Sequence, residues 1–229
     1  MLNQWNGQAK GNRWFRYFTV FCRVALALGF IPSGIVKILG ERFTALPSAH
    51  PLGNYFDALH LTGFYYTFIG IVQLVTALLL LIPRTALLGA MLYFPIILNI
   101  CVLAYSVRFE GTRITTFMVL ANLYLLVWDY DRLKHILPFS KQPVVAPITS
   151  NKFPAIFFGC VFLVLALVVV VNQFMFDIRP GNSQIECTNG CVDNDNPAAC
   201  NAFCECIYNK EKSLDVCLGE YEEMKEEHP

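Results

Sequence analysis

The chain has 229 residues, of which 55% are hydrophobic and 15% are charged, and its mean hydropathy is +0.48. Soluble domains carry charges at roughly a quarter of their positions, so this composition excludes an ordinary soluble domain and indicates a membrane protein. The net charge is zero, but 13 of the 17 basic residues precede Asp177 and 12 of the 17 acidic residues lie from Asp177 onward, which argues against a nucleic-acid partner.

Five segments are apolar and long enough to be helices that cross a bilayer, whose hydrocarbon core of about 30 Å needs roughly 20 residues. Two of them carry charges near their ends, where long side chains can reach the interface. We expect the first segment to be an uncleaved signal anchor, because it lacks an A-x-A-like cleavage site. In chain order the five segments are Phe18–Leu39, Thr62–Pro83, Thr85–Val107, Ile114–Trp128 and Phe153–Phe176.

The predicted fold class is therefore an all-α integral membrane helical bundle with a small disulfide-bonded tail. The loop 40–61 is expected to contain a short interfacial helix, because its apolar residues suit the surface of a membrane. The expected regions are an N-terminal segment (1–17), a four-helix membrane bundle (18–130), a proline-rich linker (131–152), a fifth transmembrane helix (153–176) and an acidic, cysteine-rich tail (177–229).

The loop charges predict the orientation of the chain in the membrane. Eight basic residues fall in segments that are cytoplasmic if the N-terminus is cytoplasmic, whereas the opposite loops before the tail carry three, Arg42, Arg108 and Arg113. Positive charge is enriched in cytoplasmic loops. Five crossings then place the C-terminus outside the cytoplasm, where a dense cysteine cluster is stable as disulfides. Both arguments predict a multi-pass cell-membrane protein with its lipid bilayer as one partner.

Polar residues within the spans are the candidate site residues, because a polar group at membrane depth costs free energy unless it is partnered. One hypothesis is a central pocket lined by Gln73, Asn99 and Asn122, with Arg23 reaching Asp129 near the cytoplasmic surface. The alternative is that the amides only join helices, at about 0.6 kcal/mol per hydrogen bond, and that Asp129 is a solvated anchor. The sequence leaves both open and identifies no catalytic residue.

The histidines and the cysteines of the spans show no spacing typical of metal ligands. We expect His50, His60 and His135 to be surface residues in loops or at helix ends. We expect Cys22, Cys101 and Cys160 to behave as small hydrophobic residues.

The tail contains six cysteines within 31 residues. Cysteines four apart share one face of a helix, so Cys187, Cys191, Cys200 and Cys204 suit two short helices joined by the bonds Cys187–Cys204 and Cys191–Cys200. Asn196-Pro197 is a favourable cap and first-turn proline for the second helix. Cys206 and Cys217 would close another loop before a last acidic helix. Six cysteines allow fifteen pairings, so this one is a hypothesis.

Other uses of the tail cysteines are disfavoured by their spacing. Zinc sites usually contain a C-x-x-C pair or several histidines, and the tail has no such pair and a single histidine, His228. Residues 193–197 begin like a calcium loop but lack its glycine and its glutamate at position twelve. A redox-active pair would also lack the usual C-x-x-C. We therefore predict structural disulfides, no metal site and no identified cofactor.

Three stretches suggest a known family. These are GFIPSGIVKILGERF around the first span, GIVQLVTALLLLIPRTALLGA across the second and third, and NLYLLVWDYDRLK at the end of the fourth. On these motifs the region from Arg16 to Leu137 resembles the DoxX-like family of small bacterial integral membrane proteins. The resemblance implies a four-helix membrane bundle in a bacterial inner membrane. For the namesake members it also implies an association with quinone-linked thiosulfate oxidation, and similar bundles are linked to disulfide chemistry outside the cytosol. The fifth helix and the cysteine tail depart from the common pattern of this family.

Three functional hypotheses follow, of which small-solute transport ranks last because the sequence lacks broken helices in matching repeats. The first is a non-catalytic membrane component that presents its disulfide-bonded module to a membrane or extracytoplasmic protein partner, since the sequence has no catalytic triad, metal motif or phosphate loop. The second is a redox subunit that holds a quinone near Gln73, Asn99 and Asn122 and exchanges electrons with tail thiols, which depends on analogy between folds. The sequence does not decide whether the protein is an enzyme.

Overall fold

The computed structural model describes residues 10–136, 152–192 and 194–227, and this part of the chain folds into helices without a strand. The predicted all-α class is thereby confirmed. The helices are α2 (Arg13–Ile38), α3 (Pro51–His60), α4 (Phe64–Leu81), α5 (Ala86–Ser106), α6 (Thr112–Trp128), α7 (Tyr130–Ile136), α8 (Ala155–Phe174), α9 (Gln184–Gly190), α10 (Pro197–Tyr208) and α11 (Leu214–Glu227).

Four of these helices, α2, α4, α5 and α8, are long and apolar enough to cross a membrane. The fourth predicted span corresponds to α6, which is apolar and 17 residues long. That length lies at the lower end of what a bilayer core of about 30 Å requires. The predicted interfacial helix of the first loop is α3, which begins after the N-cap residue His50 with Pro51 in its first turn.

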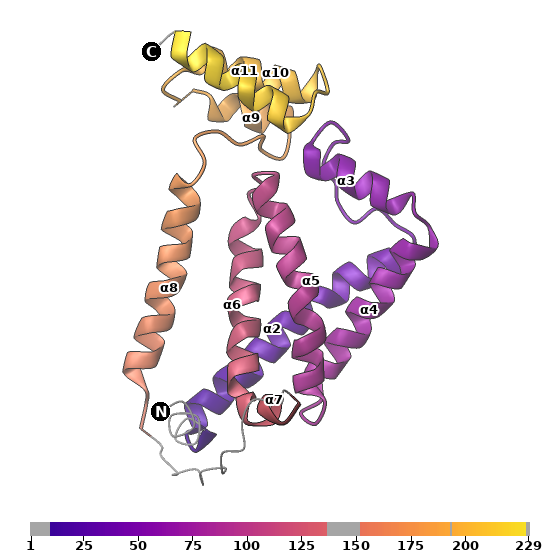
Figure 1. Cartoon of the computed structure of the whole chain (residues 1–229), viewed down its shortest axis with the longest axis vertical. Coiled ribbons are helices and arrows are strands. Elements are labelled where there is room, and N and C mark those ends of the chain that lie inside the picture. Colours follow the sequence, from indigo (N-terminus) through magenta and orange to yellow (C-terminus); the bar gives the residue numbers. More distant parts are fainter. Residues whose placement is uncertain (1–9, 137–151, 193, 228–229) are drawn as a thin grey trace.

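Helices α2, α4, α5 and α6 form a closed bundle (Figure 1). Helix α2 packs against α4, α4 against α5, α5 against α6, and α6 returns to α2. At the centre, the rings of Phe30 and Tyr93 stack with their centroids 3.8 Å apart. Small residues allow close packing, which replaces the hydrophobic effect as the main force between helices in lipid.

Helix α8 lies beside this bundle and contacts α6 (Figure 1). Asn172 is its one buried residue, and its other side chains are mostly large, apolar and exposed. So much exposed apolar surface is unusual for a protein in water and suits contact with lipid.

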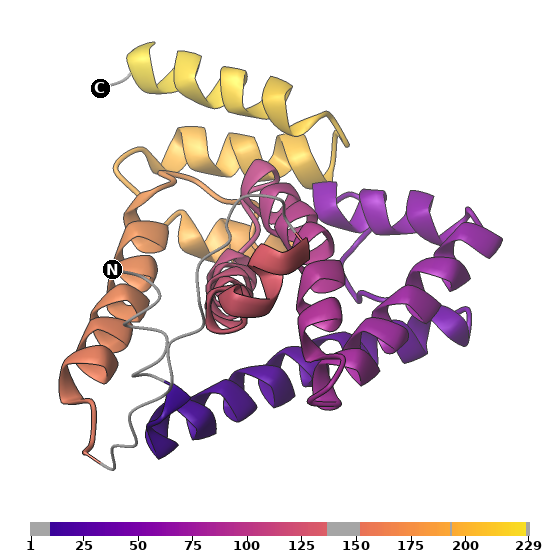
Figure 2. The ribbon, with the colours of Figure 1, turned by 60° about the horizontal axis from the view of Figure 1, so that its bottom comes forward.

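The two ends of the molecule carry different elements (Figures 1 and 2). We call the end that carries α3 and α9–α11 the module end, and the opposite end, with α7 and the start of α2, the α7 end. Helix α7 occupies the first part of the predicted linker 131–152, and residues 137–151 lie outside the described residues, as do 1–9 of the predicted N-terminal segment.

Helices α9, α10 and α11 form a separate small module with its own core. Its cysteines pack with Phe203, Ile207 and Tyr221, all of which are buried. Local signals start two of its helices: the Ser183 hydroxyl accepts a hydrogen bond from the Glu186 amide, and the Asn196 side chain accepts one from the Ala199 amide. Such caps satisfy backbone donors that a helix cannot satisfy internally.

Candidate functional site

A pocket of about 640 Å³ lies between the bundle helices near the module end, and α3 covers part of it. Its volume falls within the range of about 300–1,000 Å³ that is typical of small-molecule sites. The exposed residues Phe68 of α4 and Asn99 of α5 belong to its wall, so the pocket opens on the side of the bundle. Most of the wall is apolar and includes Phe30, Leu52, Phe56, Ile97, Leu103 and Met118.

The polar end of this pocket is formed by Lys37, Ser33 and Gln73, which are 3%, 7% and 2% exposed. Lys37 lies at the last turn of α2, where a lysine usually extends outward to water. Here its side chain turns back along the helix, and Nζ donates hydrogen bonds to the carbonyl oxygen of Ser33 at 3.1 Å and to its hydroxyl at 2.5 Å. Lys37 forms no ion pair with a described carboxylate, and the centroid of the Phe43 ring lies 4.1 Å from its Nζ.

Hydrogen-bond chemistry fixes the direction of the chain Lys37–Ser33–Gln73. An ammonium group can only donate, so the Ser33 hydroxyl accepts from Lys37 and must donate its single proton onward. It donates to Oε1 of Gln73 at 3.2 Å. The amide NH₂ of Gln73 is therefore left as a donor, and Lys37 retains one N–H beyond the two that Ser33 accepts. The polar end of the pocket is a set of donors.

Two glycines bring these residues together by letting α2 and α4 approach closely. A Cβ atom on Gly70 would lie 2.7 Å from the carbonyl oxygen of Gly34 and 2.9 Å from Cβ of Lys37. A Cβ atom on Gly34 would lie 2.9 Å from the carbonyl oxygen of Gly70. Contacts below 3 Å are not accessible to real side chains, so a larger residue at either position would separate Ser33 from Gln73.

The three amides proposed from the sequence do not share one site. Gln73 and Asn99 line the pocket, where Gln73 is buried and Asn99 is exposed. Asn122 is fully buried elsewhere in the bundle and donates to the carbonyl oxygen of Ala90 at 3.1 Å. This contact joins α6 to α5 and corresponds to the alternative interpretation, in which an amide holds helices together.

Arg23 and Asp129 meet toward the α7 end of the bundle, with Nη2 and Oδ2 3.5 Å apart. Their side chains are 14% and 11% exposed, so Asp129 is a buried ion-pair partner and the expectation of a solvated anchor was wrong. Nearby, Lys10 and Asp131 form another ion pair at 3.0 Å, which is more exposed. These pairs belong to a different part of the bundle from the pocket.

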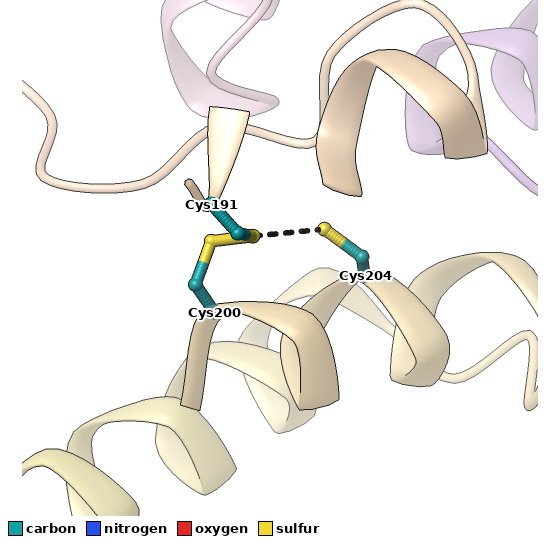
Figure 3. A group of neighbouring side chains, drawn as sticks. All are labelled: Cys191, Cys200 and Cys204. Carbon is teal, nitrogen blue, oxygen red and sulfur yellow. Dashed lines mark hydrogen bonds between the residues drawn. A yellow bond between two sulfur atoms is a disulfide. The ribbon is translucent and has the colours of Figure 1, made fainter. Parts of the chain in front are cut away.

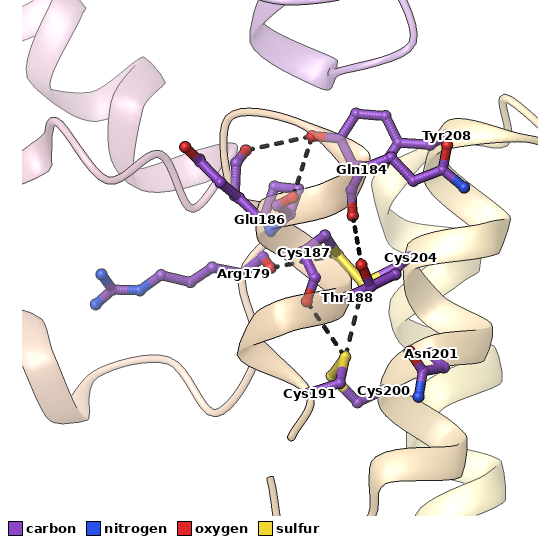
Figure 4. The surroundings of a disulfide bond; sticks show 12 residues. Arg179, Gln184, Glu186, Cys187, Thr188, Cys191, Cys200, Asn201, Cys204 and Tyr208 are labelled. Atoms are coloured by element: carbon purple, nitrogen blue, oxygen red, sulfur yellow. Dashed lines mark hydrogen bonds between the residues drawn. A yellow bond between two sulfur atoms is a disulfide. The ribbon is translucent and has the colours of Figure 1, made fainter. Parts of the chain in front are cut away.

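In the tail, the cysteines pair as Cys187–Cys204, Cys191–Cys200 and Cys206–Cys217, with Cα atoms 5.8, 5.4 and 5.7 Å apart. The first two are the pairs that the four-residue spacing favoured, and the third is the loop expected from the remaining two cysteines. The Cys187–Cys204 disulfide lies close to the segment that enters the module (Figure 4). In this segment the carbonyl oxygens of Pro180 and Gly181 accept hydrogen bonds from the Tyr208 hydroxyl. Burial raises the pKa of Tyr208 to about 12, and the nearby Glu186 carboxylate acts in the same direction.

The first two disulfides are neighbours. Figure 3 shows Cys191 and Cys200 bonded, with Sγ of Cys191 3.7 Å from Sγ of Cys204. Three of these sulfur atoms lie within 4.8 Å of one another, a spacing that could hold a metal ion only if they were thiolates. As disulfides they are not ligands. Of the cysteines outside the tail, Cys22 and Cys101 are buried and Cys160 is exposed on the apolar helix α8, and none of the three forms a disulfide.

The module contacts the bundle through the loop between α5 and α6. Arg108 donates to the carbonyl oxygen of Ile178 at 3.2 Å, and Asn182 donates to the Glu110 carboxylate at 3.2 Å. A second pocket of about 490 Å³ separates the same elements and is lined by polar side chains that include Arg113 and Arg179. Burial lowers the pKa of Arg179, and the positive charge of Arg113 adds to this effect.

His50 lies at the same junction and is fully buried, so the prediction of a surface histidine was wrong at this position. Its Nδ1 accepts a hydrogen bond from the Leu52 amide at 3.0 Å and caps α3. Burial lowers the pKa of His50 to about 4, although the nearby backbone of Gly181 in the module opposes this shift. His60 is partly exposed and contacts the Gly40 carbonyl oxygen, and the side chain of His135 lies outside the described residues.

Lys37 was not predicted as a site residue because it lies at the end of a span, where a lysine side chain usually extends to the water interface. The signal that could have identified it is the spacing Ser33-x3-Lys37, which places a hydroxyl one helical turn before the ammonium group. His50 was missed because the tail that buries it is more than a hundred residues away in the sequence.

Comparison with known proteins gives one informative match. No protein-family model matches the sequence, and no solved structure matches it. The chain is 34% identical over 131 residues to a protein described as "Uncharacterized protein YwoB" from Bacillus subtilis (strain 168). The match covers 53% of this chain and 82% of YwoB. At this identity and coverage, the chain belongs to the same family as YwoB.

Proposed function

We propose that the protein is an integral membrane protein that binds one lipid-soluble small molecule in the pocket at the module end of its bundle. The observation that supports this proposal is the buried chain Lys37–Ser33–Gln73 at the end of an otherwise apolar pocket of about 640 Å³. Burying a polar cluster costs free energy unless its groups are hydrogen-bonded and its charges are paired, so such a cluster in a membrane helix bundle points to a functional site. This one presents unused donors to a pocket that is open to the side of the bundle.

The proposal includes the arrangement in the membrane. Five crossings, by α2, α4, α5, α6 and α8, would place the N-terminus in the cytoplasm of a bacterial cell and the module end outside. In support, α3 and the disulfide-bonded module lie at the same end of the molecule, as they would if that end faced an oxidising compartment. We also propose a relationship to the DoxX-like family, supported by the closed bundle of α2, α4, α5 and α6.

Labelling in the membrane tests the binding proposal. A long-chain alkyl alcohol with a photoreactive diazirine would be irradiated with the protein in lipid nanodiscs, and the adducts mapped by mass spectrometry. We expect adducts on the pocket walls of α4 and α5. The variant Ala104→Phe fills the pocket with a ring at a buried wall position and should remove them.

The matched control is Val102→Phe, which places the same ring on the exposed face of α5. Adducts in the pocket should persist in this variant. Labelling that is confined to exposed apolar surfaces such as α8, or that is unchanged in Ala104→Phe, would contradict the proposal.

A redox role remains the alternative function for the same pocket. A quinone has two acceptor carbonyls, and the donors of Lys37 and Gln73 suit one of them, whereas Asn122 is not part of the pocket wall and donates to the Ala90 carbonyl oxygen. When bound, a quinone would supply two-electron chemistry. The variants Gln73→Leu and Asn99→Leu should then abolish quinone binding, and Asn122→Leu, which is outside the pocket, should not.

A second candidate function concerns the module, which carries exposed acidic residues along α11 (Asp215, Glu222, Glu223 and Glu226). We propose that this face could present the module to a basic protein partner outside the cell. Deleting Gln184–Pro229 should leave the bundle folded, as judged by size-exclusion chromatography, and release a protein that co-purifies with the full chain. Reversing the charge of Glu222, Glu223 and Glu226 should have the same effect, and unchanged co-purification would count against this role.

A further inference from the structure

The buried charge of Lys37 at the polar end of the pocket indicates which chemical class of ligand the pocket can bind. A buried ammonium group is costly in apolar surroundings unless an opposite charge or several hydrogen bonds compensate it. Lys37 is 3% exposed, two of its three N–H groups are used by Ser33, and no described carboxylate pairs with it. The missing counter-charge is what a ligand can supply.

The other groups at this end do not replace an anion. The ring centroids of Phe43 and Tyr66 lie 4.1 and 5.9 Å from Nζ of Lys37. Aromatic rings attract a cation, so they favour the charged form of Lys37 but do not neutralise it. Arg42 is committed to Asp57 at 2.5 Å, so that carboxylate is not available to Lys37. Gln73 adds neutral donors only.

We infer that the pocket binds a single-chain amphiphile with a carboxylate head, such as a free fatty acid, with the head at Lys37 and Gln73 and the chain along the apolar wall. This inference rests on the proposed pocket and specifies its ligand class. Two adjacent donors, one of them charged, suit the two oxygen atoms of one carboxylate. The pocket volume suits one molecule of moderate size, and most of the wall is apolar and can contact a hydrocarbon chain.

A consequence for stability separates this inference from a purely structural role for Lys37. If the ammonium group is compensated only when a ligand is bound, replacing it with an apolar side chain of similar length should stabilise the empty protein. A residue that is retained at a cost to stability is typical of a binding site. Lys37→Met should therefore raise the thermal unfolding midpoint without ligand and remove the stabilisation by ligand.

The experiment compares three competitors against the photoreactive alcohol on the full chain in nanodiscs near neutral pH. These are oleate, methyl oleate, which has the same chain without the charge, and decylubiquinone. We expect oleate to displace the alcohol at a concentration roughly tenfold or more below that of methyl oleate, the factor expected for one hydrogen-bonded charge pair. In Lys37→Met the two should become equal, and oleate should no longer raise the unfolding midpoint.

Two variants control for other effects. Arg42→Met removes a positive charge at the same end of the molecule without touching the pocket wall, and it should keep the preference for oleate. Gln73→Leu should reduce the preference in part, and Asn122→Leu should not change it. Equal displacement by oleate and methyl oleate in the unmodified protein, stronger displacement by decylubiquinone, or an unchanged preference in Lys37→Met would each overturn the carboxylate assignment. Absence of any specific labelling by the alcohol would instead overturn the pocket function itself.

Discussion

Polar residues inside the bundle are accommodated in three different ways. Arg23 and Asp129 compensate each other as an ion pair. Asn122 uses a backbone carbonyl of a neighbouring helix. Lys37 is held by Ser33 and by aromatic rings, without an acidic partner among the described residues. Removing one partner of a buried ion pair costs about 3–5 kcal/mol, because the other charge is left uncompensated. Lys37 is buried without such an acidic partner, so the free-energy cost of burying its charge is offset only by Ser33 and the aromatic rings.

Gly70 is the residue on which the geometry of the pocket depends most directly. Gly70→Ala places a Cβ atom 2.7 Å from a backbone oxygen of α2, which cannot move independently, so we expect a loss of about 1–3 kcal/mol in the free energy of unfolding. Gly159→Ala on α8 is the control, because no atom lies within 4 Å of its Cβ position. That substitution should be neutral or stabilising, since alanine favours helices over glycine. Thermal unfolding in detergent measures both, and equal midpoints would contradict the close approach.

At the scale of the elements, α3 and the entry to the module meet around His50. The histidine caps α3 and is buried beside Gly181 and Phe109, whose ring centroid lies 6.4 Å away. The module is also held at the loop between α5 and α6, where Arg108 donates to the carbonyl oxygen of Ile178 and Glu110 accepts from Asn182. Because His50 lies at this contact, we expect the stability of the contact between the module and the bundle to depend on pH.

The sign of this dependence follows from the lowered pKa of His50. When the contact opens, the histidine returns to a pKa near 6.5, so the open form binds a proton between about pH 6.5 and 4 and the closed form does not. The closed form should be fully stable above about pH 6.5 and lose roughly 3 kcal/mol as the pH falls to about 4. The protection of α3 and of the segment around Gly181 against hydrogen exchange, corrected for the intrinsic exchange rate at each pH, should therefore decrease as the pH falls through this range.

A variant that keeps the cap but does not titrate provides the control for this prediction. Asparagine is a favourable N-cap residue, so His50→Asn should preserve α3 and flatten the pH dependence of exchange. If the variant and the unmodified protein respond equally to pH, another group controls the contact.

At the scale of the whole molecule, the bundle, α8 and the module differ in what stabilises them. The bundle is closed by helix contacts, α8 presents a nearly continuous apolar surface, and the module combines a small core with three disulfides. A core as small as that of the module usually needs such covalent bonds, which stabilise by restricting the unfolded chain. The polypeptide therefore suits two environments, lipid along the helices and an oxidising aqueous phase at the module end.

The proposed orientation predicts which cysteines an impermeant maleimide reaches. After gentle reduction of intact cells, the sulfur atoms of the module should react, whereas a cysteine introduced in the linker as Ser140→Cys should react only after the cells are opened. Mass spectrometry of the labelled protein distinguishes the two sites. The reverse pattern would place the module in the cytoplasm and overturn the proposed topology.

The sequence by itself determined the helical class, the approximate limits of the long helices and the favoured pairing of the cysteines. Each of these depends on local composition or on short spacings, such as long uncharged runs or cysteines four residues apart. Asn196-Pro197 likewise predicted the start of α10 where the structure has it.

The tertiary structure alone decided which polar residues share a site. Gln73 and Asn122 are both amides on apolar helices, yet the first lines the pocket and the second joins two helices, because this depends on which neighbour each helix face meets. Lys37 turned into the bundle rather than toward water for the same reason: Ser33 lies one turn earlier, and the close contact between Gly34 and Gly70 places Gln73 beside it. His50 likewise lies beside Phe109 and the backbone of Gly181, which are distant from it in the sequence, so no local pattern encodes its burial.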